Sequence, residues 1–478
     1  MMPERQAKWA LATAPEACAR GGMIQGMTAA NSKSAWSDQG ALEATYRGHI
    51  ESQIARHDRA LERAGAAHAV IFSGAPKLRF LDDSYYPFQA NPHFVSWLPL
   101  TGMPFCYLIY TPGETPLLVY YQEKDYWHQP PAAPEGYWTP YFDIRIVHEV
   151  DDVAAHLPEH KEKCVLLGEI DDDAHAFGIE RCNPTTVLNN LHFARATKTP
   201  YELECMRAAS RRGVAGHRAA EAAFREGRSE FDIHLAYCRA VEHAENDLPY
   251  GNIVALNENG AILHYQHQSM QAPKEIRSFL IDAGASCNGY ASDITRTYAY
   301  ESGAFADLID RMDELQRSLV NQVQAGIDYP ALHTEAHRQI GQLLIDLRLA
   351  SGTVESLMAN GVTAAFYPHG LGHFLGIQVH DVGGFMADET GTVIDRPPEH
   401  PFLRLTRSLE VDQVLTIEPG LYIIDLLLEN LEGTPGHSML NHAEIDKLRP
   451  FGGIRIEDNV RVLDNGCENL TRDAFSAA

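Results

Sequence analysis

The 478-residue chain has 45% hydrophobic residues, 22% charged residues and a formal net charge of −25, values typical of a globular protein. This excess of acid argues against binding to nucleic acid or to an anionic membrane, because both need clustered Lys and Arg. Eight scattered cysteines without a CxxC pair favour reduced thiols and a cytoplasmic location. No apolar run approaches the roughly 18 residues of a membrane-spanning helix.

The length predicts two domains, preceded by a poorly ordered extension over residues 1–38. A cleaved signal peptide is the disfavoured alternative there, because Pro15 and Glu16 interrupt a short apolar stretch. Residues 39–194 alternate between an amphipathic helix, "HIESQIARHDRALERAG", and short buried strands, "HAVIFSG", "FCYLIY", "PLLVYY" and "KCVLLGEI". This pattern predicts a small α/β domain.

A strong helix start marks the boundary near residue 195. Thr199 is expected as N-cap, Pro200 as the first helical residue and Glu202 as its capping-box partner, and Ser229 is expected to cap the next helix. Strand patterns then dominate in "SFLIDAGA", "SDITRTYAY", "QVLTIEPGLYII" and "GIRIEDNVRV". Residues 195–478 are therefore predicted to form an α+β domain, with 385–410 and 425–450 as insertions or lids.

Two acids flank a predicted hairpin in "FLIDAGASCNGYASDITRTY". Asn288-Gly289 favours a two-residue turn, which places residue 293 opposite residue 284. Asp282 and Asp293 then point to the same face as diagonal neighbours, so both carboxylates reach one ion. A solvent-exposed hairpin with two incidental acids is the alternative, and a bulge would shift the register.

Further candidate ligands follow towards the C-terminus. Glu418 in "VLTIEPG" and Glu457 in "GIRIED" lie on apolar strands, and Arg455 shares the face of Glu457 by the strand period. The segment "FYPHGLGHFLGIQVHDVGG" adds histidines among glycines, which suit a backbone that passes close to a ligand; a strand with incidental histidines is the alternative. Four carboxylates and one imidazole favour two bridged divalent ions, Mn²⁺ above all, which supply a hydroxide nucleophile.

The order Asp-x10-Asp, "HGLGHFLGIQVHD", "TIEPG", "GIRIED" resembles the metallopeptidase family with the pita-bread fold, which includes methionine aminopeptidase, aminopeptidase P and prolidase. The N-terminal "LDDSYYPFQANPHFVSWLPLTG" is similar to the bacterial Xaa-Pro dipeptidase branch, some members of which are organophosphorus acid anhydrolases. The resemblance implies a creatinase/aminopeptidase-like catalytic domain after a smaller α/β domain.

The resemblance also implies roles for individual residues. The implied metal ligands are Asp282, Asp293, His373, Glu418 and Glu457. The implied catalytic residues are Glu418 as proton shuttle, His380 at the scissile carbonyl, His264 and His369 near the metals, and Arg455 as an anchor of the carboxylates. Tyr250 is expected near the substrate, and Arg404 is expected to clamp the proline carboxylate, with Arg407 or a solvated loop arginine as the alternatives. Trp97 is a candidate wall of the partner's site in an implied homodimer.

The expected activity is hydrolysis of Xaa-Pro dipeptides with two divalent ions, Mn²⁺ favoured over Co²⁺ or Zn²⁺, and with organophosphorus esters or fluorides as side substrates. Three alternatives remain open at this point. An aminopeptidase P would cleave longer peptides, a binding module would cleave none, and a creatine-type hydrolase would need no metal. The retained carboxylates disfavour the last two.

Overall fold

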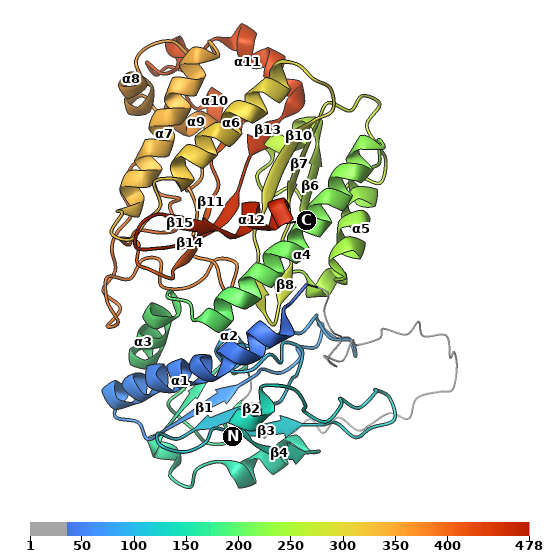
Figure 1. The fold of residues 1–478 in the computed structure, drawn as a ribbon, viewed down its shortest axis with the longest axis vertical. Coiled ribbons are helices and arrows are strands. Elements are labelled where there is room, and N and C mark those ends of the chain that lie inside the picture. Colours follow the sequence, from blue (N-terminus) through green and yellow to red (C-terminus); the bar gives the residue numbers. More distant parts are fainter. Residues whose placement is uncertain (1–35, 172, 478) are drawn as a thin grey trace, which may run out of the picture.

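The computed structural model describes residues 36–171 and 173–477, so the expected extension falls, up to residue 35, outside the described residues. Figure 1 shows a smaller N-terminal part below and a larger C-terminal part above, with the long helix α4 running up from their junction. Both parts mix helices and strands, as the sequence predicts.

The N-terminal part is built on one mixed sheet with the strand order β4-β3-β2-β1-β5. β1 pairs with β2 antiparallel and with β5 parallel, and β3 pairs with β4 parallel. The elements of this part are α1 (Gln39–Ala64), β1 (His68–Phe72), α2 (Pro92–Val95), β2 (Tyr107–Tyr110), β3 (Leu117–Tyr121), β4 (Asp143–Val147), β5 (Cys164–Leu167) and α3 (Thr185–Arg195). The predicted strands are present, whereas β4 is missed because "DIRIV" is largely exposed and lacks a buried apolar run.

The junction between the two parts forms as the capping signals predict. α4 (Pro200–Arg225) begins with the Thr199 and Glu202 capping box, and Ser229 caps α5 (Glu230–Val241). Each cap satisfies backbone N–H groups that the first helical turn leaves free, which fixes where the helix starts.

The C-terminal part holds four small sheets, with strand orders β10-β7-β6, β11-β14-β15, β12-β13 and β8-β9. Their strands are β6 (Ile253–Leu256), β7 (Ser278–Asp282), β8 (Ser286–Cys287), β9 (Tyr290–Ala291), β10 (Thr295–Ala299), β11 (Val414–Ile417), β12 (Gly420–Tyr422), β13 (Gly453–Arg455), β14 (Asp458–Val462) and β15 (Cys467–Asn469). The remaining helices are α6 (Ala304–Val320), α7 (Tyr329–Asp346), α8 (Val354–Ala359), α9 (Val362–Phe366), α10 (Asp425–Glu429), α11 (His442–Leu448) and α12 (Leu470–Ala477). Short 3₁₀ helices cover 139–141, 150–156, 161–163, 173–176, 245–247, 257–261, 437–439 and 449–451.

The alternation of side chains along β7 decides which way Asp282 points. Phe279 and Ile281 pack against α4 and α5, while Leu280 packs on the opposite face beside Tyr422 of β12. Asp282 follows Leu280 by two residues and therefore shares its face. The first acid of the predicted pair is thus turned away from the helices and towards β12 and β13.

Two predicted segments differ from the expectation. "QVLTIEPGLYII" forms two strands, β11 and β12, because Pro419 cannot donate a ladder hydrogen bond. Residues 425–450 contain the helices α10 and α11 and are therefore more ordered in secondary structure than the predicted insertion or lid. Residues 385–410 contain no helix or strand.

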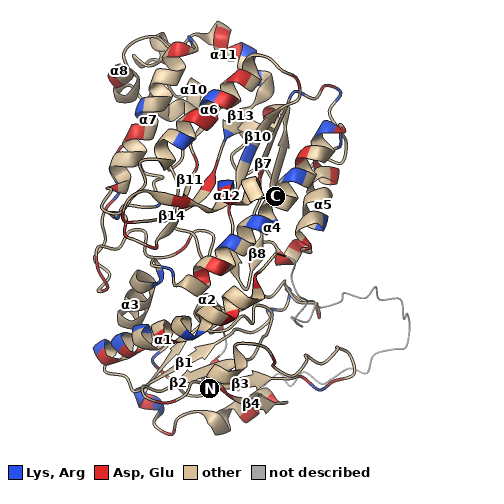
Figure 2. Ribbon diagram, viewed as in Figure 1, with Lys and Arg blue, Asp and Glu red and all other residues tan. Residues whose placement is uncertain are grey.

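Acidic and basic residues are interspersed along the outer faces of α1, α4 and α6 (Figure 2). Within residues 36–171 and 173–477, no helix is both long enough and apolar enough to cross a membrane.

Candidate active site

The hairpin brings Asp282 and Asp293 together in the predicted register. β7 and β10 pair Asp282 with Thr295, and the turn pairs Cys287 with Tyr290, so residue 284 lies opposite residue 293 with no bulge between. The hydroxyl of Tyr250 lies 2.8 Å from Asp282 Oδ1 and 2.5 Å from Asp293 Oδ1. The Tyr250 hydroxyl can donate its one proton to only one of these carboxylates at a time, so the other carboxylate needs a different partner.

Arg455 and Glu457 reach the same cluster from the end of β13. Thr295 donates a 2.6 Å hydrogen bond to Glu457 Oε2, and Arg455 Nε donates to Thr295 Oγ1 at 3.2 Å. Arg455 Nη2 also lies 2.7 Å from Asp282 Oδ2. The guanidinium therefore holds one carboxylate directly and orients Glu457 through the threonine.

His373 and Glu418 close the cluster from the other side. His373 Nε2 lies 3.5 Å from Asp293 Oδ2 and 3.7 Å from Glu418 Oε1. Nδ1 lies 3.0 Å from the Phe374 carbonyl, which can only accept, so Nδ1 carries a proton and Nε2 is the nitrogen that faces the acids, whose charges outweigh burial and raise the pKa of His373. This is the tautomer that a metal-binding histidine requires.

Gly372 explains why the histidine segment is rich in glycine. Its φ of 157° suits glycine, and a Cβ there would lie 2.1 Å from the Thr416 carbonyl oxygen. The backbone of this segment packs directly on β11, which brings the His373 N–H within 3.1 Å of Thr416 Oγ1. Any other residue at 372 would force this segment and β11 apart.

The cluster carries more negative charge than the chain balances. Arg455 is the guanidinium next to Asp282, Glu418 and Glu457, whereas Asp293 lies beside His373. Burial, reinforced by the neighbouring carboxylates, raises the pKa of Glu457 well above its usual range and the pKa of Glu418 to about 7.

These donors fit divalent ions. One ligand atom each from Asp293, His373 and Glu457 lies within 4.8 Å of the others. Cations placed among these donors reverse the sign of the repulsion between the carboxylates, and an oxygen-rich donor set suits hard to borderline ions. The residues present therefore fit the divalent metal ions that the sequence predicts.

Three further histidines surround this cluster. His369 lies between Tyr422, whose hydroxyl is 2.8 Å from its Nε2, and Glu418, whose Oε2 is 3.8 Å from its Nδ1. Burial and the charge of Arg455 lower the pKa of His369 to about 3, which keeps it neutral. The His380 ring is perpendicular to that of His373 at 4.4 Å between centroids, and His264 is exposed.

His380 is held in place by a buried ion cluster that the sequence reading did not single out. Asp381 Oδ1 lies 2.6 Å from Arg195 Nη2, and its Oδ2 lies 3.0 Å from Lys198 Nζ. Arg195 ends α3 and Lys198 precedes α4, so the cluster ties the histidine segment to the junction of the two parts. The "HD" pair was visible in the sequence, but its partners lie more than 180 residues away.

Tyr422 and Thr295 were also missed. The Tyr422 hydroxyl accepts from Arg455 Nη1 at 2.9 Å and contacts His369, so it links two predicted residues. Gly420 lies opposite Arg455 in the β12–β13 pair, which places Tyr422 near the guanidinium. Predicting the role of Tyr422 requires this pairing register, which neither strand's sequence reveals by itself.

A cleft of about 1230 Å³ leads to the carboxylates. His264, His380 and Tyr250 line it together with residues of the N-terminal part, including Phe88, Gln89, Pro92 and Val95. Substrate therefore meets the site between the two parts of the chain.

The two candidate clamp arginines differ sharply. Arg407 is buried, ion-paired with Glu410 and stacked on Phe193 at 4.1 Å, so it is not free to bind substrate. Arg404 is exposed, and its charge contributes to lowering the pKa of His380 to about 4, after burial and the charge of His373. Arg404 therefore stays the candidate clamp, whereas Arg407 is committed to the fold.

The expectation for Trp97 is wrong. Its side chain is fully buried in the N-terminal core, and its indole N–H donates to His57 Nε2 at 3.3 Å. A side chain with no exposed surface does not line a pocket of a neighbouring subunit. Trp97 packs the core because the segment that follows α2 turns inward towards α1.

The fold and the convergent acids define a metal-dependent hydrolase of two parts. Residues 204–464 match the model of "Metallopeptidase family M24", and residues 44–193 match "Xaa-Pro dipeptidase, N-terminal domain". The chain belongs to metallopeptidase family M24.

Full-length relatives support this assignment. The chain is 49% identical to a protein from Xanthomonas euvesicatoria pv. vesicatoria described as Xaa-Pro dipeptidase, over 92% of this chain and 100% of the relative. It is 50% identical to a protein of the same description from Shewanella baltica, over 90% and 97%. Aminopeptidase P from E. coli with the inhibitor Pro-Leu is similar in structure, with a TM-score of 0.67 and 25% identity over 88% of this chain and 95% of that one. These matches confirm the predicted α+β fold with a pita-bread catalytic domain after a smaller α/β domain.

Proposed function

We propose that the protein hydrolyses the Xaa-Pro bond of dipeptides that end in proline, with two divalent metal ions in its active site. The observation that carries this proposal is the convergence of four buried carboxylates and His373, with more negative charge than the chain itself balances. The relatives described as Xaa-Pro dipeptidase support the substrate class, because they match nearly the whole chain.

Mn²⁺ is the proposed ion, because oxygen donors outnumber the single imidazole; Co²⁺ and Zn²⁺ are the alternatives. When bound, the ions supply a Lewis acid and an activated water. Arg455 and Thr295 orient the carboxylates, and Tyr250 fixes the pair Asp282 and Asp293.

The side chains around the carboxylates are proposed to bind the substrate and to transfer protons. His380 lines the cleft as a neutral imidazole, so its N–H is free to donate to the scissile carbonyl. His264 lines the same cleft. Glu418 has 17% of its side chain exposed, compared with 8% for Asp293, so it is the better placed to carry a proton to the leaving prolyl nitrogen.

Arg404 is the proposed reader of the free proline carboxylate. A guanidinium binds a carboxylate through two parallel hydrogen bonds, and the side chain of Arg404 is free to do so. This contact is what restricts cleavage to dipeptides, because a longer peptide or an amide has no carboxylate at that position.

The test compares Ala-Pro, Ala-Pro-amide and an Xaa-Pro-Xaa tripeptide on protein stripped of metal and reloaded with Mn²⁺. We expect activity to return with metal and to be confined to the dipeptide. Arg404→Ala should raise KM for Ala-Pro by roughly 10–100-fold, the value of a charge-assisted contact of about 1.5–3 kcal/mol. Arg338→Ala, an exposed arginine on the outer face of α7, is the matched control and should leave KM unchanged.

The other outcomes each point elsewhere. Cleavage of the tripeptide or the amide favours an aminopeptidase P, to which the fold is also similar. Metal-loaded protein that cleaves none of the three substrates contradicts the peptidase proposal. Organophosphorus esters and fluorides stay as predicted side substrates, to be assayed with the same metal-loaded sample.

A homodimer in the cytoplasm is part of the proposal. The segment around Phe80 and Leu81 leaves these side chains 88% and 91% exposed, which favours a covering partner, and a second copy is the proposed one. The cysteines of the described residues are all free thiols, as a reducing compartment requires. Light scattering of wild-type protein and of Phe80→Ser tests the dimer, which should weaken in the variant.

A further inference from the structure

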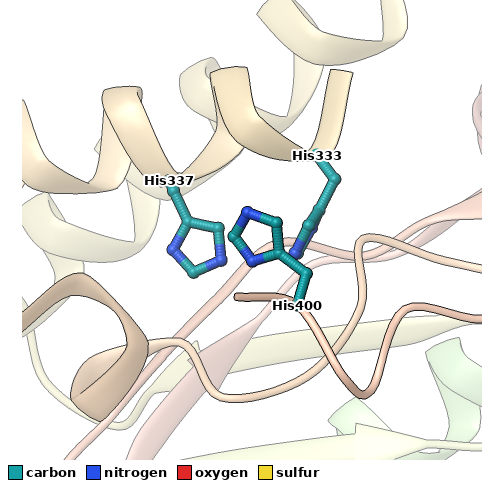
Figure 3. A group of neighbouring side chains, drawn as sticks. All are labelled: His333, His337 and His400. Carbon is teal, nitrogen blue, oxygen red and sulfur yellow. The ribbon is translucent and has the colours of Figure 1, made fainter. Parts of the chain in front are cut away.

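A second group of metal-binding side chains lies outside the carboxylate cluster. His333 and His337 are one helical turn apart on α7. His400 approaches them from the 385–410 segment, downstream of the isolated β-bridge at Val393. Figure 3 shows the three imidazole rings facing one another, two from the helix and one from the loop. Nothing in the proposed hydrolysis uses these residues.

The distances suit ligation of one ion. Each histidine offers a ring nitrogen within 4.8 Å of those of the other two. Three nitrogens on a tetrahedral ion at about 2.0–2.1 Å stand about 3.4 Å apart, so side-chain rotations must bring the three nitrogens closer to bind one ion. The rings of His333 and His400 are nearly perpendicular with centroids 4.3 Å apart, whereas those of His337 and His400 are stacked at 4.8 Å, so one of the stacked rings must turn for both to face one ion.

The hydrogen bonding of the two helix residues leaves lone pairs for a ligand. His333 is 2% exposed, and its Nδ1 is buried with no hydrogen-bond partner among the described residues. A buried nitrogen left unpaired is costly and needs an explanation. His337 is 4% exposed and contacts Thr363 Oγ1 through Nδ1 at 3.2 Å, which leaves its Nε2 for other partners.

The three rings are also in the protonation state that metals require. Burial and the neighbouring rings lower the pKa of His333 well below its usual range, and they lower the pKa of His337 to about 3. Burial lowers the pKa of His400 as well. Neutral imidazoles bind metal without first losing a proton.

A cavity of about 290 Å³ provides room for a further ligand. It is lined by all three histidines and by Phe402, Leu403 and Leu431, among others. A water in this cavity completes a four-coordinate site of three histidines, and the apolar walls give it a low-dielectric surround.

We propose that His333, His337 and His400 bind one borderline transition-metal ion, Zn²⁺ by preference, separate from the ions of the carboxylate cluster. Three imidazoles without a carboxylate suit Zn²⁺, whereas the oxygen-rich cluster suits Mn²⁺. One chain then holds two kinds of metal site, distinguished by their donors.

Such an ion fastens the loop that carries Arg404 to helix α7. His400 donates its backbone N–H to Pro397 at 2.8 Å and accepts from Leu403 at 3.2 Å, so the imidazole belongs to a tight local fold. Arg404 follows directly. The ion therefore joins the substrate-reading loop to the helical core at a point four residues away from the arginine.

The experiment counts metal ions per chain in the full-length protein. Metal-stripped protein is loaded with Mn²⁺, given excess Zn²⁺, freed of unbound metal by gel filtration and analysed by elemental mass spectrometry. Wild type should hold three ions in total and His400→Ala two. His400→Cys, which replaces one zinc ligand with another, should restore three. His442→Ala, which removes an exposed histidine whose ring pairs with that of His437, is the matched control and should hold three ions.

Counting the total separates a new site from exchange, because Zn²⁺ that merely displaces Mn²⁺ from the carboxylates leaves two ions. A folded His400→Ala protein that holds as many ions as wild type overturns the proposal. Hydrogen exchange gives a second measurement: Zn²⁺ should slow exchange of the amides of residues 397–404 in wild type and not in His400→Ala. None of these results depends on peptidase activity.

Discussion

Two buried carboxylate settings lie at opposite ends of the segment from His373 to Asp381, and their charge balance differs. Asp381 has two cations of its own, Arg195 at 2.6 Å and Lys198 at 3.0 Å. At the candidate metal site, in contrast, Asp282, Glu418 and Glu457 share the one guanidinium of Arg455. An acid that the chain itself neutralises holds the fold together, whereas acids left in excess mark a place for external cations.

The same contrast separates two adjacent residues. Glu457 faces the metal site, and burial raises its pKa. Asp458 points to the other side, where Arg296 lies 2.7 Å and Arg472 2.6 Å from its carboxylate. Its pKa is lowered, because these arginines and their hydrogen bonds outweigh burial. Strand alternation thus assigns one acid of "IED" to the site and the other to the fold.

The largest expected effect comes from Glu457→Gln, because Glu457 is the ligand whose pKa burial and the neighbouring carboxylates raise well above its usual range. Activity should fall by more than about 100-fold, since even the loss of an outer partner of a metal ligand costs about 10–100-fold. The metal-free variant, however, should melt at a higher temperature than metal-free wild type, because it lacks the acid whose ionisation burial and the neighbouring carboxylates oppose. Thermal unfolding after chelation measures this, and a metal-free variant less stable than wild type contradicts the excess-charge interpretation.

Asp381→Asn should act in the opposite direction on stability. It leaves Arg195 and Lys198 buried without a counter-charge, for which a loss of about 3–5 kcal/mol in the free energy of unfolding is expected. Urea denaturation of the metal-free protein measures it beside Glu457→Gln. If both variants shift stability in the same direction, the distinction between the two settings fails.

The sequence predicted the metal ligands better than the residues that hold those ligands in position. Asp282 and Asp293 were placed together because their separation is local and Asn288-Gly289 sets the hairpin register. Tyr422 and the Arg195–Asp381–Lys198 cluster were missed because each depends on contacts between segments far apart in the chain. Trp97 was misplaced for the same reason, since burial is a property of the packed core and not of the local motif.

A neutral buried group extends the comparison to pH. His57 has its Nδ1 2.9 Å from the Gln53 carbonyl and accepts from the Trp97 indole, so both nitrogens are used without a charge. Burial lowers its pKa from the ordinary 6.5 to about 4. The unfolded chain therefore takes up a proton first, so the stability that neutral His57 contributes is present above pH 6.5 and is lost as the pH falls towards 4.

Within that window the free energy of unfolding should fall by about 1.4 kcal/mol per pH unit, because the unfolded chain binds one more proton than the folded chain. The free energy of unfolding of wild type and of His57→Gln, measured in urea at pH 7 and pH 5, gives the difference directly. His442→Gln, at an exposed position, is the control and should track wild type. Equal slopes for wild type and His57→Gln would show that His57 is not the group that titrates.

The smallest effect is expected from Tyr422→Phe, which tests how the shared guanidinium is held. The hydroxyl accepts from Arg455 at 2.9 Å and contacts His369 at 2.8 Å, and the variant removes both contacts while keeping the ring. Arg455 keeps Asp282 and Thr295, so the ions should stay bound. With His369 less well oriented, kcat should fall about 10-fold, the lower range for an outer partner, with KM nearly constant. Loss of metal in this variant would instead mean that Tyr422 supports the carboxylates themselves, and that the single shared charge is less firmly anchored than its contacts indicate.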